Sequence, residues 1–132
     1  MMTFDPRTLA KPVYDSLTAL SQGTSDKTKR KEQKNQAVEL YTYLSTWGLI
    51  RLKAEEKALQ SSKPEKVKVI QEFFDCLQQI SGHQNLSTAQ GLNTLTNLPV
   101  EDYLGLTGLG LAIAQEFSFW ATAIYHDVTG AD

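Results

Sequence analysis

Most of the basic side chains of this 132-residue chain stand close together in the sequence. Residues 27–68 hold eleven basic and five acidic side chains, a net charge of +6. On a helix, Lys27, Lys31 and Lys34 would line one side at spacings of four and three, with Arg30 beside them. Cationic groups in such a row suit the phosphates of a nucleic-acid backbone. The candidate contacts are Lys27, Lys29, Arg30, Lys31, Lys34, Arg51, Lys53 and Lys57.

The overall charge of −2 hides this concentration. Residues 69–132 hold seven acidic side chains and no lysine or arginine. If the two charged regions lie on opposite faces, the acidic face of one copy can dock on the basic face of the next, head to tail. A solvated helix start is the plainer interpretation of the lysines, because free-standing nucleic-acid binders are usually strongly basic overall.

Signals for other chemistry are weak. Cys76, His83 and His126 lack the CxxC or HExxH spacing of metal sites. The glycines of residues 105–110 follow the order GxxGxG, with no preceding strand pattern, so helix packing explains them better than phosphate binding. We therefore expect no catalytic residues, no metal and no cofactor, and we expect that the chain is not an enzyme. The single cysteine favours a reducing, cytoplasmic location.

Helical periodicity dominates the sequence and predicts an all-α fold, a compact bundle of about five helices. We expect one domain over residues 1–132, with an N-terminal segment at 1–26 and a bundle core at 27–126. Pro12 should kink or interrupt an early helix, and residues 27–60 form either one helix or two. A helix should start at Ser62–Glu65 and stop at Gly82, a short one should lie within 82–98, and the last should run from Pro99 to about His126.

Apolar residues three and four apart mark the faces expected to be buried. They are Ala37, Leu40, Tyr41, Leu44 and Trp47; Val67, Ile70, Phe73, Phe74, Leu77 and Ile80; and Leu109, Ile113, Phe117, Trp120 and Ile124. Gly108 and Ala112 would let another helix approach closely. Residues 103–125 are long and apolar enough to suggest a membrane span, but Gln115 and Glu116 at the centre favour a buried helix instead.

Three segments resemble a known family. Residues 41–50, YTYLSTWGLI, follow the basic segment into a Gly-Leu step, and residues 98–107, LPVEDYLGLT, precede the aromatic-rich FSFWATA at 117–123. Together they resemble the small all-helical subunit of type III CRISPR RNA-guided effector complexes, especially the Cmr-type complex. The family's last helix usually carries basic residues near its tryptophan, and here that helix has none, so the N-terminal basic row is the remaining candidate for RNA contact.

The resemblance implies a non-catalytic subunit in antiviral defence that stacks beside the backbone subunits holding the guide RNA. Its basic face would contact phosphates of the guide and target RNA, while base pairing with the guide supplies sequence specificity. Two other interpretations stay open. The chain is a helical protein–protein adaptor with bipolar charge and no nucleic-acid role, or a peripheral membrane protein that uses its last helix.

Overall fold

The computed structural model describes residue 5 and residues 7–128. This part of the chain forms five helices: α1 (Arg7–Gln22), α2 (Lys27–Ala58), α3 (Pro64–Ser81), α4 (Gly91–Asn97) and α5 (Val100–Ile124). No strand occurs within these described ranges. The expected all-α fold of about five helices is confirmed.

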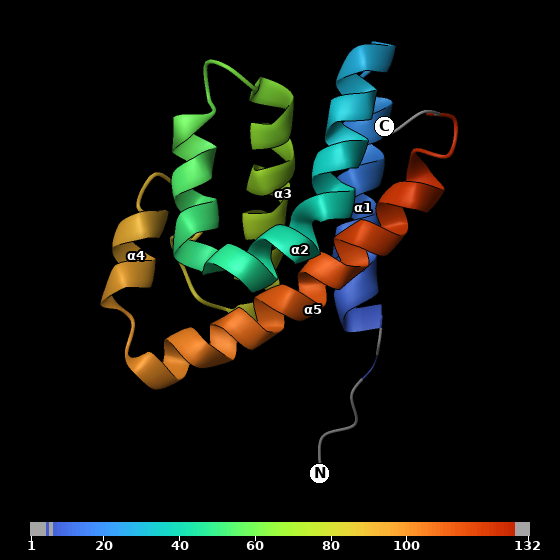
Figure 1. The fold of residues 1–132 in the computed structure, drawn as a ribbon. Coiled ribbons are helices and arrows are strands. Elements are labelled where there is room, and N and C mark those ends of the chain that lie inside the picture. The colour runs from blue at the N-terminus through green and yellow to red at the C-terminus, as the bar shows by residue number, and fades with distance from the viewer. Residues whose placement is uncertain (1–4, 6, 129–132) are drawn as a thin grey trace.

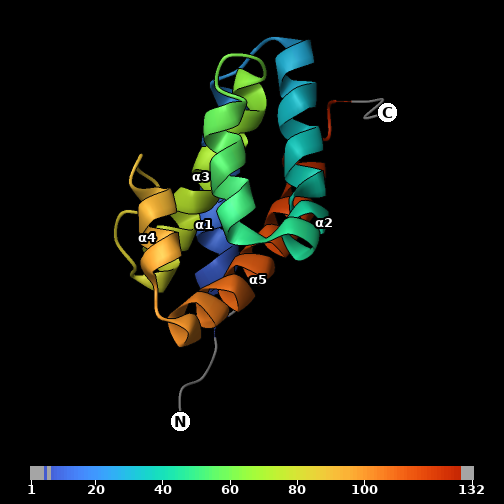
Figure 2. The same ribbon diagram turned by 60° about the vertical axis from the view of Figure 1, so that its left-hand side comes forward.

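The path of the chain brings several helix ends together (Figure 1). α1 runs upward in this view, and α2 descends beside it, turns at its middle and climbs again. α3 then descends, and α5 crosses the lower front of the bundle from the short α4 towards the start of α2. Figure 2 confirms that both ends of α2 and the start of α3 share one end of the molecule. The basic segment 27–68 is therefore folded back on itself.

Gly48 produces the turn within α2. Its φ of 87° and ψ of 174° leave the helical region, in a conformation that side chains other than glycine rarely adopt. Residues 27–60 therefore hold two helical arms that meet at a sharp kink at Gly48. We call residues 27–47 the first arm and residues 49–58 the second arm.

The predicted ends of α3 are confirmed, and each has a local cause. Pro64 occupies the first helical turn, where its missing N–H costs nothing, and Glu65 places a carboxylate near the positive end of the helix dipole. At the other end, Gly82 takes the left-handed conformation with a φ of 82°. The prediction for Pro12 was wrong in part, since α1 continues through it as one uninterrupted helix.

All five helices contribute to one core. Val13 and Leu17 of α1 are fully buried in it, so the core begins before residue 27. Around them pack buried side chains of α2, α3 and α5, among them Leu40, Leu44, Leu49, Phe73, Phe74, Leu77, Ile113 and Phe117. Phe73 lies at the centre, with its ring 5.2 Å from Phe74 and 5.9 Å from Phe117 in edge-on contacts.

Several residues of the expected core are not fully buried. Tyr41 and Trp47 are exposed, because the first arm turns a narrower stripe, Ala37, Leu40 and Leu44, towards α5 and α3. On α5 the buried stripe is Leu106, Gly110, Ile113, Ala114, Phe117 and Ala121, while Leu109, Trp120 and Ile124 are half-buried.

The glycine of close approach is Gly110 rather than Gly108. A Cβ at Gly110 would lie 3.2 Å from Leu49 and 3.5 Å from Phe73, whereas one at Gly108 would meet nothing within 4 Å. The expected buried helix at residues 103–125 is α5, which packs against α1, α2 and α3. Across the described ranges, none of the helices combines the length and apolar character needed to cross a bilayer.

Candidate nucleic-acid interface

The start of α2 brings three of the predicted basic residues to one pocket. Lys27 and Lys29 are exposed, and Lys31 is half-buried. Lys27, Arg30 and Lys31 line one shallow pocket, whose opposite wall is formed by Asp127 and Val128 after α5. Of the predicted row, Lys27, Arg30 and Lys31 therefore lie together, and Lys34 does not line this pocket. We call the group Lys27, Lys29 and Lys31 the lysine cluster.

Asp26 fixes the start of the first arm. Its carboxylate accepts hydrogen bonds from the backbone N–H groups of Thr28 and Lys29, at 2.8 and 3.2 Å. This cap satisfies two of the free N–H groups of the first turn. An anion at this surface would therefore meet lysine side chains rather than those two amides.

Arg30 is committed to contacts within the molecule. Its guanidinium donates to the carbonyl oxygen and the hydroxyl of Ser21, at 2.6 and 2.7 Å, and to Oδ1 of Asp127 at 2.7 Å. It also lies over the Tyr125 ring, 5.2 Å from the centroid. Only 13% of the side chain is exposed. The hydrogen bond from Arg30 holds the pKa of Asp127 below its ordinary value, so this carboxylate stays charged beside the lysine cluster.

Lys34 also reaches the C-terminal segment. Its Nζ donates to the backbone carbonyl oxygen of Val128 at 2.9 Å. Arg30 and Lys34 together hold the turn after α5 against the first arm. Of the predicted RNA contacts on this arm, these two already have partners, and the lysine cluster remains available.

A buried polar network supports this end of the bundle. Gln33 donates to Oε1 of Glu65 at 2.7 Å and to the Thr24 hydroxyl at 3.0 Å, and it accepts from the Tyr125 hydroxyl at 2.7 Å. Burial raises the pKa of Tyr125, so its hydroxyl stays a donor. The network joins α2, α3 and the end of α5, which sequence reasoning missed because Gln33 and Tyr125 are far apart in the chain. Lys68 completes it by pairing with Glu65 at 3.2 Å.

The three residues of the second arm that were predicted to contact RNA differ in their exposure. Arg51 is exposed, with its guanidinium 4.7 Å from the centroid of the Trp47 ring. Lys57 is exposed near the end of the arm. Both remain candidates, but Gly48 separates them from the lysine cluster along the chain.

The prediction that Lys53 contacts RNA is wrong, because only 4% of its side chain is exposed. Its Nζ pairs with Oε1 of Glu56 at 2.8 Å and lies 4.8 Å from the centroid of the Phe74 ring. Gly91 of α4 packs against its side chain so closely that a Cβ there would collide with it. A buried lysine with an internal partner cannot reach a phosphate, so Lys53 is removed from the predicted surface.

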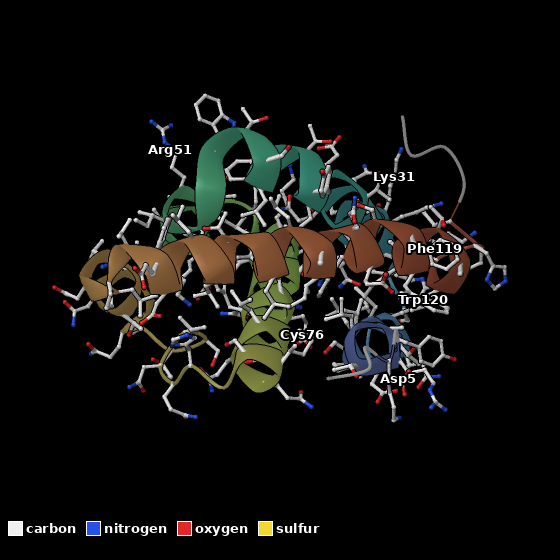
Figure 3. The ribbon with its side chains drawn as sticks, turned by 90° about the horizontal axis from the view of Figure 1, so that it is seen from below. Asp5, Lys31, Arg51, Cys76, Phe119 and Trp120 are labelled. Carbon is white, nitrogen blue, oxygen red and sulfur yellow. The ribbon has the colours of Figure 1, made fainter. Side chains whose placement is uncertain are left out.

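Acidic side chains gather along the seam between α1 and α3. Asp15, Glu72 and Asp75 all raise the pKa of Cys76, which burial carries to about 11. Burial, together with the negative charge of Asp75, also raises the pKa of Glu72. Figure 3 shows Cys76 and Asp5 on one side of α5, and Lys31 and Arg51 on the other. The separation of charge is partial, because Asp127 and the exposed Glu39 lie with the basic residues and Lys11 pairs with Asp15.

Cys76, His83 and His126 stand apart in the fold: within α3, just after α3, and just after α5. Cys76 is buried, and its Sγ lies 3.4 Å from the Ser16 hydroxyl. Among the residues that the structure describes, no three histidine, cysteine or acidic side chains come close enough to hold a metal ion. The chain matches no family model, no curated protein and no solved structure.

Proposed function

We propose that this chain is a non-catalytic helical subunit that contacts the phosphate backbone of RNA through the lysine cluster. The observation that carries the proposal is that Lys27 and Lys31 line one pocket, with Lys29 exposed on the same turn of the helix. Lysines held on a capped helix attract phosphates and release counterions when RNA binds. Such contacts give affinity and register without reading the bases.

The proposed setting is a type III CRISPR ribonucleoprotein effector complex in antiviral defence. This part of the proposal rests on the resemblance of residues 41–50 and 98–123 to the small subunit of that family. An all-helical bundle with a basic helix start is compatible with such a subunit. Its partners would then be the backbone subunits, the guide RNA and the target RNA, and base pairing would supply specificity.

Head-to-tail self-association is the second part of the proposal. Lys31 of the lysine cluster lies on one side of α5, and Cys76, which is close to the acidic seam of Asp15, Glu72 and Asp75, lies on the other (Figure 3). A contact between unlike patches repeats from copy to copy and builds a filament unless it closes into a ring. Sedimentation at low and high salt tests it: an assembly should form at low salt and dissociate at high salt.

RNA binding is tested by titrating the full chain with labelled single-stranded RNA over a series of salt concentrations. Reversing Lys27, Lys29 and Lys31 to glutamate should weaken binding and reduce the slope of log K against log salt by roughly 2, since each phosphate contact contributes about 0.7. An unchanged slope would exclude the lysine cluster as the RNA contact.

A matched pair of single variants controls for charge alone. Lys27→Glu and Lys11→Glu make the same change at exposed helical lysines, but Lys11 lies on α1 and pairs with Asp15 at 3.1 Å. Only Lys27→Glu, which changes a residue of the pocket, should reduce the salt slope. Equal losses in both variants would indicate that net charge, and not this surface, governs binding.

The adaptor interpretation is favoured by a different surface. Tyr14 of α1 and Phe119 of α5 are 45% and 60% exposed, and both rings contact Trp120 edge-on, at 5.3 and 5.0 Å. Exposed aromatic clusters are typical of protein contacts. Isolation of the native protein with its partners separates the two functions: RNA should be recovered if the first is correct, and proteins without RNA if the adaptor is correct.

A further inference from the structure

The first arm ends in Trp47, which is not packed in the core. Trp47 is 51% exposed, although its helical spacing predicts burial. The guanidinium of Arg51 lies over its ring, 4.7 Å from the centroid, so one face of the indole carries a cation. Because half of the side chain is still exposed, a second planar group can reach the ring.

Trp47 also forms one wall of a shallow pocket on the outer side of the first arm. The other lining residues are Glu39, Thr42, Tyr43 and Thr46. The Thr46 hydroxyl already donates to the carbonyl oxygen of Thr42 at 2.9 Å. Glu39 is exposed, and none of the ion pairs among the described residues includes it. The pocket therefore combines a flat aromatic surface with a carboxylate that can accept hydrogen bonds.

This chemistry differs from that of the lysine cluster. A carboxylate repels phosphate, but it accepts hydrogen bonds from the exocyclic amino groups of bases. Aromatic rings stack on bases of any kind, and arginine adds a cationic contribution to such platforms. The pocket suits a base better than a phosphate.

The position on α2 links the two surfaces. Lys27 and Trp47 stand at the two ends of the first arm, about 30 Å apart along a helix of that length. Figure 3 shows Lys31 and Arg51 on the same side of α5. A single strand held by the lysine cluster could follow this arm to the tryptophan.

We propose that Trp47 and Arg51 form a stacking site for an unpaired RNA base, whose amino group faces Glu39. This inference rests on the proposed RNA-binding function and adds the ligand class of a second site. It assigns to Arg51 a stacking role in place of a simple phosphate contact. Bases with an exocyclic amino group, such as adenine, should bind more tightly than uracil.

The test uses intrinsic fluorescence, since Trp47 and Trp120 are the only two tryptophans of the chain. Trp120→Phe leaves Trp47 as the reporter, and the matched variant Trp47→Phe leaves Trp120, which donates to Glu116 at 3.1 Å. Oligoadenylate of roughly 12 nucleotides, within the site sizes of single-strand binders, should quench the emission of Trp47 and leave that of Trp120 unchanged. If Trp120→Phe does not fold, the difference between the wild type and Trp47→Phe reports the same signal.

Affinity measurements give a second readout. Trp47→Ala should weaken oligoadenylate binding roughly 5- to 150-fold, the range for loss of one stacked base, while Trp47→Phe keeps a ring and loses less. An abasic strand of equal length should bind the lysine cluster without quenching Trp47. Glu39→Gln should reduce the preference for oligoadenylate over oligouridylate.

Three results would overturn the inference, and they differ in what else they remove. Salt-dependent binding of oligoadenylate with no change in Trp47 emission would remove the stacking site and leave the proposed function standing. No binding of any RNA would remove both. A change of Trp47 emission with protein concentration alone would show that the tryptophan is a protein contact.

Discussion

Lysine side chains are exposed on the first arm of α2, but one of them, Lys53, is buried on the second arm. The first arm turns Ala37, Leu40 and Leu44 inward and leaves Lys27 and Lys29 exposed. The second arm has neighbours on more sides, since α4 packs on it as well, and it buries Lys53 against Glu56. A lysine count along the sequence therefore overstates the basic surface, because burial is decided by the neighbours of each helix face.

The largest expected effect concerns the buried pair of the second arm. Lys53→Met removes the cation and leaves the carboxylate of Glu56 without its partner, which should lower the free energy of unfolding by about 3–5 kcal/mol. Urea denaturation measures this loss. Lys29→Met on the first arm is the matched control and should change stability by no more than about 0.5 kcal/mol.

A double variant separates the charge from the packing. Lys53→Met with Glu56→Leu removes both charges and should restore most of the stability, since apolar replacements of buried pairs are often tolerated. Equal costs of Lys53→Met and Lys29→Met would contradict the difference between the two arms.

The next effect concerns the kink that separates the arms. Gly48→Ala places a Cβ on a residue with a φ of 87° and should destabilise the fold by about 1–3 kcal/mol. Gly108→Ala is the control, because a Cβ there meets nothing within 4 Å and the residue is inside a regular helix. Thermal unfolding of the two variants should differ, with Gly108→Ala at or above the wild-type melting temperature. A tolerated Gly48→Ala would mean that α2 does not need the kink.

A smaller effect is expected at the start of the first arm, which is held by its cap. Asp26→Ala removes the acceptor for the N–H groups of Thr28 and Lys29 and should cost about 1 kcal/mol. Asp26→Asn keeps an acceptor and should cost less. Hydrogen exchange should show faster exchange at residues 28–30 in the alanine variant, with no change at residues 49–58. A uniform increase over both arms would contradict a local role for the cap.

The smallest effect concerns Asp127, whose carboxylate lies beside the lysine cluster. Asp127→Asn removes the carboxylate that engages Arg30, so RNA should bind about two- to fivefold more tightly, and the salt slope should steepen by up to about 0.7. The pKa of Asp127 is lowered, so the wild-type contact exists at neutral pH and is lost only as the pH falls through that lowered value. Weaker RNA binding in this variant would show that Asp127 orients Arg30 rather than competing with phosphate.

Much of the fold could be predicted from local signals. Periodicity located the helices, and Pro64 and Gly82 marked the ends of α3 because their backbone preferences are intrinsic. The candidate site was predicted in part. The row of Lys27, Arg30 and Lys31 followed from helical spacing alone, and the structure places all three on one pocket.

The errors have a common cause. Trp47 was expected in the core, Lys53 on the surface, and Arg30 free to bind RNA. In each case the helix was correctly predicted, but its rotation against the neighbouring helices was not. Spacing defines a face, whereas packing chooses which part of that face is covered.

The sequence by itself therefore determined that the chain is helical and that its basic residues lie in one stretch, because backbone preferences and charge are properties of single residues. Only the tertiary structure decided which lysines are exposed and that Asp127 pairs with Arg30. It also decided that Gly110 rather than Gly108 is the close contact of α5. These outcomes depend on residues distant in the chain. Their contacts form when the helices pack, and no local pattern specifies them.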